Sequence, residues 1–361
     1  LSIEGKHVSA LVHFKSGVLT VNVKLASSFI SPEQAELNLQ REIGADAFEV
    51  TKEKARLAWE KILGRVQVQG GAETDKMNFY TALYRVMLFP RKFFEFDAKG
   101  QMVHYSPYNG QVLPGYMFTD NGFWDTFRAV FPLFSVLFPE LDSQIMQGLV
   151  NTYKESGWLP EWASPGHRDC MIGSNSASLV TEAWLKGIRG FDIETLYAAM
   201  VKNSQSVGPV ASVGRLGAEH YNRVGYVPYN VGINENTART LEYAYADYCI
   251  WQLGQKLGKP EAATFAKRAQ NWRNVFDKSS NFMRGRNADG SWQSPFRPDK
   301  WGDAFTEGSS WHYTWSVFHD PAGLAGAMGG KAQMAAKLDS IFSSAPTFDY
   351  SYYGFPIHEI T

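Results

Sequence analysis

The chain has 361 residues, 44% of them hydrophobic, which is enough to bury one large core or a large domain with a smaller attachment. Lys and Arg number 35 and Asp and Glu 36, so the net charge is -1 and there is no broad basic surface to hold a phosphate backbone. No apolar run reaches the roughly 18 residues needed to cross a bilayer. We therefore expect neither a nucleic-acid partner nor a membrane span.

Cysteine usage leaves the cellular compartment open. Cys170 and Cys249 are the only cysteines, too few for a disulfide framework and without the CxxC spacing of a metal site. The chain begins at Leu1 with no basic segment followed by an apolar core, so we expect no signal peptide within it. Aromatic residues make up 14% of the chain and include 11 tryptophans, many beside Gly, Pro or acidic residues, which is typical of carbohydrate sites.

The first 30 residues predict a β-hairpin. Residues 19–25 alternate apolar and polar side chains with a period of two, and residues 8–14 do so loosely on the other side of Ser16 and Gly17. Two strands cannot bury a face by themselves. We therefore expect the hairpin to be the remnant of a β-domain that precedes it.

Helical patterns dominate from residue 31 onward. Ser31 is a capping residue, Pro32 takes the first helical position and Gln34 follows three residues after the cap, so a helix is predicted that ends near Gly44. Further helices are predicted at 51–63, 74–88, 120–137, 141–153, 176–188, 193–203, 235–257 and 261–276. Paired helices joined by long loops favour an α/α toroid with functional loops at one end, although no sequence repeat marks it.

One carboxylate, Glu307, precedes a glycine and lies among aromatic residues in the segment 306–315. A carboxyl group held against apolar rings loses hydration of its charged form, so it can keep its proton near neutral pH and donate it to a leaving oxygen. The rings, Trp311 among them, offer flat faces to a sugar. The alternative is that Glu307 opens a helix, where a carboxylate favours the positive end of the helix dipole and the aromatic residues face the core.

Two other segments combine charged side chains with tryptophan. In 119–128, Trp124 can stack on a ligand while Asp125 and Arg128 point to one side of a starting helix, and the alternative is a capped helix with an internal ion pair. The segment 157–173 has the turn residues of an ordered loop. Its polar and stacking side chains are Trp158, Glu161, Trp162, His167, Arg168 and Asp169.

Glu161 and Glu307 both lie near tryptophan in loop-like sequence, which makes them a candidate acid and base pair. A lone histidine such as His167 is more often a hydrogen-bonding residue than a metal ligand. The sequence has no GxGxxG after a strand and no GxxxxGK[ST], GxSxG or HExxH motif. Nucleotide-binding, serine-hydrolase and zinc-protease functions are therefore not supported.

Several short segments point to one family. They are WDTFR at 124–128, GWLP at 157–160, CMIG at 170–173, TLEYAY at 240–245, AQNWR at 269–273 and TEG at 306–308, followed by Trp311 and Tyr313. In that order they resemble glycoside hydrolase family 92, and the similarity runs from about Ser31 to the last residue. One such segment would be weak evidence, whereas the ordered set is specific.

The resemblance implies a fold and an activity. The family consists of calcium-dependent, exo-acting α-mannosidases that invert the anomeric centre, built from an N-terminal β-sandwich and an (α/α)6 barrel. For this chain it implies a mainly α fold: the end of the β-sandwich domain at 1–30, linker helices at 31–70, and part of the (α/α)6-toroid-type catalytic barrel, incomplete at its C-terminus, at 71–361.

The resemblance also implies residue roles. Glu307 becomes the general acid that protonates the glycosidic oxygen, and inverting hydrolysis needs a second carboxylate roughly 6.5–9.5 Å away to activate water. Glu161 is then a supporting residue, not the base. The substrate-binding residues implied or offered by the same segments are Trp124, Asp125, Trp162, Arg168 and Trp311.

The family's segments that supply the calcium ligands and the base would lie beyond Thr361, so no metal ligand is assigned here and we expect the chain alone to be inactive. The implied substrate is a mannose-containing oligosaccharide or glycoprotein N-glycan, and the implied location is extracellular or periplasmic. Linkage preference and oligomeric state stay open. Two other functions are also open: a carbohydrate-binding protein without catalysis, and another inverting α/α-toroid glycosidase or a phosphorylase, which would require phosphate.

Overall fold

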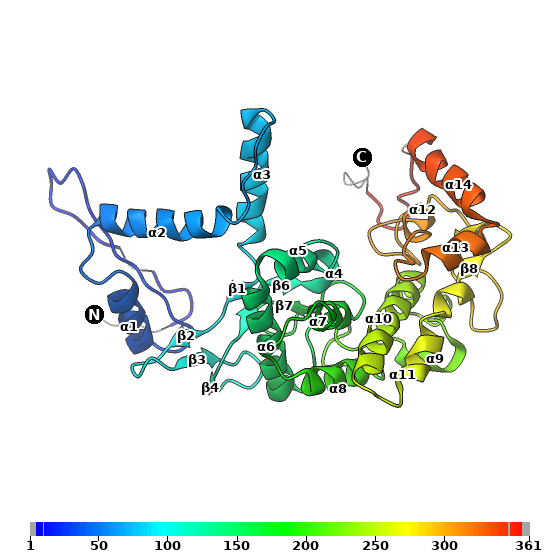
Figure 1. The fold of residues 1–361 in the computed structure, drawn as a ribbon, viewed down its shortest axis with the longest axis horizontal. Coiled ribbons are helices and arrows are strands. Elements are labelled where there is room, and N and C mark those ends of the chain that lie inside the picture. The colour runs from blue at the N-terminus through cyan, green and yellow to red at the C-terminus, as the bar shows by residue number, and fades with distance from the viewer. Residues whose placement is uncertain (1–4, 10, 346, 356–361) are drawn as a thin grey trace. The chain divides into compact units, whose positions relative to one another are not determined.

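A computed structural model of the chain describes residues 5–9, 11–345 and 347–355. It divides into two compact units (Figure 1). The first contains the residues up to Gln67 together with Phe96–Gly100, and the second contains Val68–Glu95 and the residues from Gln101 onward. The first unit thus keeps the segment before residue 30 with the helices that follow it. None of the helices in the described ranges has both the length and the apolar character that crossing a membrane requires.

The first unit contains helices α1 (Pro32–Glu42) and α2 (Phe48–Leu63). The predicted start of α1 is confirmed, because the Ser31 hydroxyl accepts a hydrogen bond from the backbone N–H of Gln34 at 3.1 Å. The helix ends at Glu42, two residues before the expected Gly44, whose φ of 53° is one that glycine adopts without strain. The Gln34 side chain then donates to the carbonyl of Phe96, which holds the 96–100 segment against α1.

The predicted β-hairpin is not found in the described residues of this unit. Residues 16 and 17 form the expected turn, with Gly17 at a φ of 89°, but 11–15 and 18–27 are neither helix nor strand. The apolar side chains of these segments are exposed, with Leu19 98% and Leu25 84% accessible. Because nothing covers that face within the described residues of the unit, the period-two pattern has no apolar burial to stabilise a pair of strands. The strand prediction is therefore wrong for these residues.

The second unit holds short antiparallel strand pairs at the ends of its loops. The pairs are β1 (Arg91–Lys92) with β5 (Phe118–Thr119), β3 (Met102–Tyr105) with β4 (Val112–Pro114), β6 (Asn121–Gly122) with β7 (Trp162–Ala163), and β8 (Phe276–Asp277) with β9 (Phe282–Met283). A further short strand, β2 (Glu95–Phe96), lies at the boundary between the units. These short strands join loop segments to one another and do not form a sheet layer in the core.

Helices make up most of the second unit. They are α3 (Glu73–Val86), α4 (Phe123–Thr126), α5 (Val130–Leu137), α6 (Pro139–Ser156), α7 (Ser176–Leu185), α8 (Ile193–Asn203), α9 (Ala218–Val224), α10 (Asn236–Lys256), α11 (Ala262–Arg268), the 3-10 helix η1 (Asn271–Asn274), α12 (Ser310–Tyr313), α13 (Pro321–Ala327) and α14 (Lys331–Ser343). Consecutive helices pack as pairs: α5 with α6, α7 with α8, α10 with α11 and α13 with α14. The mainly helical, paired organisation expected from the sequence is confirmed.

Two predicted helices are interrupted. The pattern at 120–137 predicts one helix, but α4 ends at Thr126 and α5 begins at Val130. Pro132 explains the break, because its ring would clash with the carbonyl of Arg128 in a continuous helix and it has no N–H to donate. The pattern at 261–276 also predicts one helix, but the chain leaves it after Arg268. There the backbone around Val275 pairs with β9 instead, accepting from the N–H of Arg284 at 2.9 Å.

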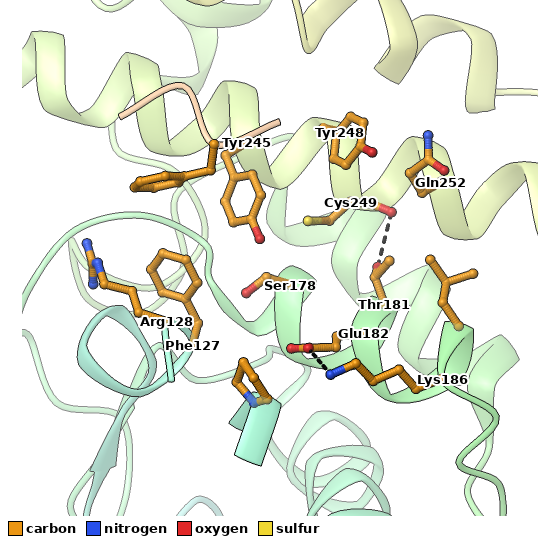
Figure 2. A pocket seen from close by; sticks show the side chains of 13 residues that line it. Phe127, Arg128, Ser178, Thr181, Glu182, Lys186, Tyr245, Tyr248, Cys249 and Gln252 are labelled. Carbon is orange, nitrogen blue, oxygen red and sulfur yellow. Dashed lines mark hydrogen bonds and ion pairs between the residues drawn. The ribbon is translucent and has the colours of Figure 1, made fainter. Parts of the chain in front are cut away.

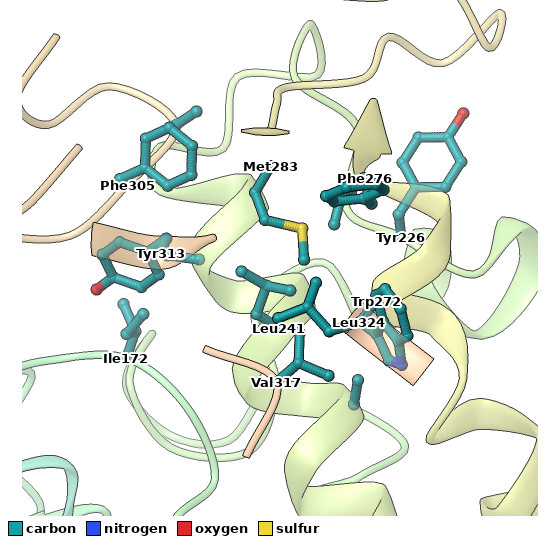
Figure 3. Packing of buried hydrophobic residues seen from close by; sticks show 14 of the residues in the cluster. Ile172, Tyr226, Leu241, Trp272, Phe276, Met283, Phe305, Tyr313, Val317 and Leu324 are labelled. Carbon is teal, nitrogen blue, oxygen red and sulfur yellow. The ribbon is translucent and has the colours of Figure 1, made fainter. Parts of the chain in front are cut away.

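The largest core cluster gathers around α10 (Figure 3). Leu241 from α10 lies with Ile172 from the 157–173 loop and with Phe305 and Tyr313 from the segment that carries Glu307. Fully burying an apolar side chain contributes about 1.5–3 kcal/mol. This cluster therefore ties together loops that are far apart in the sequence and that carry the candidate site residues.

Candidate active site

Glu307 lies in a closed loop that precedes α12. The backbone N–H of Gly302 donates to the carbonyl of Gly308 at 2.8 Å, and the Tyr313 hydroxyl donates to the carbonyl of Thr306 at 2.7 Å. Glu307 itself has a φ of 45°, in the left-handed region that costs a non-glycine residue about 1 kcal/mol or more. Its side chain is exposed. The loop thus holds a strained backbone that presents this carboxylate to solvent.

The helix-opening alternative for Glu307 does not describe the structure. α12 begins at Ser310, and its cap is Ser309, whose hydroxyl accepts from the backbone N–H of Trp311 at 3.2 Å. Glu307 lies before this cap and has left-handed backbone geometry instead of a helical start. Its position is therefore not explained as a helix N-terminal carboxylate.

The aromatic rings next to Glu307 in the sequence do not enclose its side chain. The Trp311 ring packs edge-on against Phe282, with 4.7 Å between ring centroids, and the Tyr313 ring stacks on Phe305 at 5.4 Å. Trp311 also lines a cavity of about 410 Å³ that none of the other predicted sugar-binding residues lines. The expectation that these rings desolvate Glu307 is wrong, because they pack into neighbouring structure while the carboxylate stays exposed.

Trp124 and Asp125 are positioned by the short antiparallel pair β6–β7, which comes directly before α4. Gly122 pairs with Trp162, and the backbone N–H of Phe123 donates to the carbonyl of Glu161 at 2.9 Å. A Cβ atom at Gly122 would lie 2.2 Å from the Trp162 ring, so the ring rests directly on the bare backbone there. This close contact joins the predicted Trp162 to the start of α4, where Trp124 and the exposed Asp125 follow.

Arg168 and Cys170 belong to a loop that Ser212 fastens. The Ser212 hydroxyl donates to the carbonyl of Arg168 at 2.9 Å, and the backbone N–H of Cys170 lies 3.3 Å from the same hydroxyl. Asp169 accepts from the backbone N–H of Ser212 at 2.9 Å. The Arg168 guanidinium lies 6.0 Å from the centroid of the Trp162 ring. These contacts fix the backbone of the loop from which the exposed Arg168 side chain extends.

Three predicted site residues act electrostatically on Cys170. Burial raises the pKa of the Cys170 thiol, the positive charge of Arg168 lowers it, and the negative charges of Asp125 and Glu307 raise it further. Such interactions between charges weaken with distance and are largely screened at a protein surface beyond about 10 Å. The structure therefore brings Asp125, Arg168 and Glu307, from three separate segments, into one electrostatic neighbourhood.

Asp125 has the properties of a ligand-binding carboxylate at the edge of this neighbourhood. Partial burial raises its pKa above the ordinary value, and the nearby Arg128 works in the opposite direction. The predicted placement of Asp125 and Arg128 on one side is consistent with this interaction. Arg128, however, also contacts other groups. Its guanidinium lies 4.7 Å from the centroid of the Trp124 ring and 3.8 Å from a Glu242 oxygen.

Glu161 is buried, unlike the exposed Asp125, Arg168 and Glu307. It is 4% exposed, and its two carboxylate oxygens accept hydrogen bonds from the Ser176 N–H at 3.0 Å and the Ser176 hydroxyl at 2.6 Å. Ser176 is the first residue of α7, so Glu161 binds the N-terminus of that helix. A carboxylate held this way cannot reach a water molecule in the pocket. The geometry supports the supporting role expected for Glu161 and gives no support to a role as base.

We expect Glu161 to make stability pH-dependent. Burial raises its pKa from 4.5 to about 8, so between these values the folded protein binds a proton that the unfolded chain releases. The free energy of unfolding therefore falls as pH rises from about 4.5 to 8. Thermal melting at pH 5 and at pH 8 should show a smaller loss of Tm in Glu161→Gln than in the parent. The control Glu219→Gln, an exposed carboxylate on α9, should keep the parental difference, and equal losses in all three proteins would contradict the assignment.

His167 is a partly buried aromatic residue. Its ring lies 4.7 Å from the Tyr108 ring, and neither of its nitrogens has a hydrogen-bond partner among the described residues. Burial lowers its pKa to about 4, so it is neutral at physiological pH. The preferred expectation of a hydrogen-bonding histidine is therefore wrong, because the ring packs without polar contacts.

Glu242 is a site-supporting residue that the sequence motif contains but that we did not select. It is 3% exposed in the first half of α10, and its Oε1 accepts from the indole N–H of Trp124 at 3.1 Å. Burial raises its pKa, while Arg128 and the Trp124 hydrogen bond lower it. The available signal was an acidic residue within TLEYAY, a run whose other members are largely apolar or aromatic. A carboxylate in the middle of a buried helix needs a polar partner.

A cavity of about 630 Å³ adjoins this group (Figure 2). Arg128 and Phe127 line one side, Tyr245 and Tyr248 of α10 line another, and Glu182 of α7 lies opposite them. Glu182 forms an ion pair with Lys186 at 2.6 Å. Arg128 thus lines the cavity and also contacts the Trp124 ring and Glu242.

The residues described do not provide a calcium site. Among 5–9, 11–345 and 347–355 there is no group of three or more His, Cys, Asp or Glu side chains arranged to hold a metal ion. Calcium prefers six to eight oxygen ligands, many of them carboxylates. We therefore assign the described residues no metal ligand and no metal-dependent step.

Comparison with known protein families places the chain among the glycosyl hydrolases. The model of the glycosyl hydrolase family 92 catalytic domain matches residues 34–356. The chain therefore belongs to glycoside hydrolase family 92, which confirms the resemblance seen in its motifs.

Solved and curated relatives agree with this membership. The structure is similar to that of a family 92 inverting mannosidase from Bacteroides thetaiotaomicron, with 52% identity, a TM-score of 0.86 and coverage of 92% of this chain and 45% of that one. It also resembles a family 92 α-mannosidase from the same organism solved with mannoimidazole, at 30% identity, a TM-score of 0.80 and coverage of 89% and 42%. An uncharacterized secreted glycosidase from Arthroderma benhamiae is 28% identical over 94% of this chain and 46% of its own length. The chain spans about half the length of these relatives.

Proposed function

We propose that this protein hydrolyses terminal α-mannosides of glycans with inversion, and that Glu307 is the general acid. The observation that supports this most is the match to the family 92 catalytic domain over residues 34–356, within which Asp125, Arg168 and Glu307 all act on the pKa of Cys170. The similarity to an inverting mannosidase and to a mannosidase that binds mannoimidazole supports the choice of sugar. The finer architecture of an (α/α)6 barrel, preceded by a β-sandwich remnant at 1–30, is part of the same proposal.

The proposed chemistry uses groups that can reach a ligand. Glu307 donates its proton to the glycosidic oxygen as the bond from that oxygen to the anomeric carbon breaks. A water molecule attacks the opposite face of the sugar and gives its proton to a base. Asp125 and Arg168 hydrogen-bond the sugar hydroxyls, and Trp124 and Trp162 provide aromatic surface. Trp311 is the weakest member of the proposed set, because its ring packs against Phe282.

The base is proposed to lie outside the 361 residues. Near the Glu307 neighbourhood, Glu161 and Glu242 are buried and bound to protein donors, and Asp125 is assigned to the sugar. We therefore expect the 361-residue chain to bind mannosides without turning them over. Calcium dependence, with ligands outside the described residues, and secretion are carried into the proposal from the family and from the secreted relative.

The full-length gene product is expected to release mannose from an α-mannobiose without inorganic phosphate. Chromatography of the products with and without phosphate checks this expectation. Turnover that requires phosphate would identify a phosphorylase instead. Binding of the disaccharide without any cleavage would identify a carbohydrate-binding protein.

A further inference from the structure

Glu242 has no part in the chemistry proposed above, yet it is bound to two residues at the edge of the site. Its Oε1 accepts from the Trp124 indole N–H at 3.1 Å and lies 3.8 Å from Arg128 Nη2. The carboxylate side chain is 2% accessible, so these contacts are shielded from water. A charged hydrogen bond in such a place is worth more than one at the surface.

Arg128 holds the same indole from a second direction. Its guanidinium lies over the Trp124 ring at 4.7 Å and over the Phe127 ring at 4.5 Å from the ring centroids. It also donates to the backbone carbonyl of Trp124. The indole is therefore held at its N–H edge by Glu242 and on one face by Arg128, which Glu242 attracts. Both constraints depend on one buried carboxylate.

Glu242 also contacts the loop that carries Arg168 and Cys170. Gly173, at a φ of 89°, approaches it so closely that a Cβ atom there would lie 3.2 Å from Glu242 Oε2 and 3.3 Å from Glu242 Cβ. The N-terminus of α10, the helix that carries Glu242, binds the Glu307 segment. The N–H groups of Thr237 and Ala238 both donate to the carbonyl of Ala304 at 3.1 Å. α10 is thus the common support of all three site segments.

We propose that Glu242 is a positioning residue that sets the orientation of the Trp124 indole, and with it the mannose-binding surface beside Asp125. This inference rests on the proposed function. Glu242 does not act as acid or base, because its accessible surface is negligible and its Oε1 is engaged by Trp124. Its Oε2 lies against Gly173, and a hydrogen bond from the Asn175 side chain also lowers the pKa of the carboxyl.

The test uses the full-length gene product and mannoimidazole as the probe, with dissociation constants from calorimetry. Glu242→Leu removes the acceptor and the charge, and we expect mannoimidazole binding to weaken about 10- to 100-fold, the equivalent of a lost charged hydrogen bond. Glu242→Gln keeps an acceptor of the same shape for the indole, and we expect it to recover most of that loss. Glu182→Leu, on the opposite side of the cavity, serves as the matched control and should bind as the parent does.

A double-mutant cycle with Trp124→Phe separates positioning from general destabilisation. Phe keeps an aromatic ring but lacks the N–H, so if Glu242 acts through the indole, Glu242→Leu should weaken binding less in the Trp124→Phe background than in the parent. Additive losses would overturn the inference, as would parental affinity in a folded Glu242→Leu protein. If Glu242→Leu does not fold, Trp124→Phe decides the outcome, because it removes the same hydrogen bond from the other side. Parental affinity in Trp124→Phe would then overturn the inference. A parental protein that does not bind mannoimidazole would overturn the proposed function as well.

Discussion

Glu307→Gln should lower kcat/KM for a natural α-mannoside about 10²- to 10⁴-fold, the usual contribution of a general acid. Glutamine keeps the size and polarity of the side chain but cannot protonate the glycosidic oxygen. The exposed position of Glu307 in a closed, strained loop suits this role, because the carboxyl can reach a ligand while its backbone is held in place. Steady-state hydrolysis of an α-mannobiose by the full-length gene product measures the effect.

The leaving group provides the control for this prediction. A dinitrophenyl mannoside needs little protonation, so Glu307→Gln should reduce its cleavage far less than that of the disaccharide. Glu219→Gln, which alters an exposed carboxylate on α9, should leave both rates unchanged. Parental rates for the disaccharide in Glu307→Gln would remove Glu307 from the chemistry, and equal losses on both substrates would indicate a binding role instead.

Asp247→Asn should destabilise the folded protein by about 3–5 kcal/mol, the usual cost of breaking a buried ion pair. Asp247 is fully buried, and its two oxygens accept from Arg215 at 2.7 Å, Arg268 at 2.8 Å and the Tyr221 hydroxyl at 3.0 Å. Asparagine keeps the volume but leaves the Arg215 guanidinium, which is also fully buried, without a counter-charge. The midpoint of urea unfolding, followed by circular dichroism, measures the loss.

A surface ion pair in the same unit is the matched control. Glu194 is paired with Lys259 but is 61% exposed, so Glu194→Gln should change the free energy of unfolding by less than about 1 kcal/mol. The difference between the two variants isolates the effect of burial. An Asp247→Asn protein as stable as Glu194→Gln would show that this network does not hold α10 to the elements around it.

Much of the helical fold could be predicted because its signals are local. Ser31 and Pro32 mark the start of α1, and the predicted helix at 193–203 coincides with α8. The failures come from non-local physics. The alternation around Leu19 predicts strands, but nothing in the described residues of its unit buries that face. The pattern through Arg128 predicts a continuous helix, but the ring of Pro132 interrupts it.

The site could be predicted in part for the same reason. Asp125, Arg168 and Glu307 were recognisable because charged residues in turn-rich or aromatic loops seldom serve the core, and the structure brings them together around Cys170. The surroundings of Glu307 could not be predicted, since sequence proximity to Trp311 does not tell where that ring packs. Glu242 was missed because its partner, Trp124, is distant in the chain and meets it only after α10 is buried.

The stereochemistry of the first product tests the proposed function most directly. Proton NMR of the full-length gene product acting on an α-mannobiose should show the β-anomer of mannose first, with the α-anomer appearing only as mutarotation proceeds. That order requires a water molecule attacking the face opposite the bond that Glu307 protonates. Initial release of the α-anomer would contradict the account, because it would mean a retaining mechanism with a nucleophile that this site does not assign.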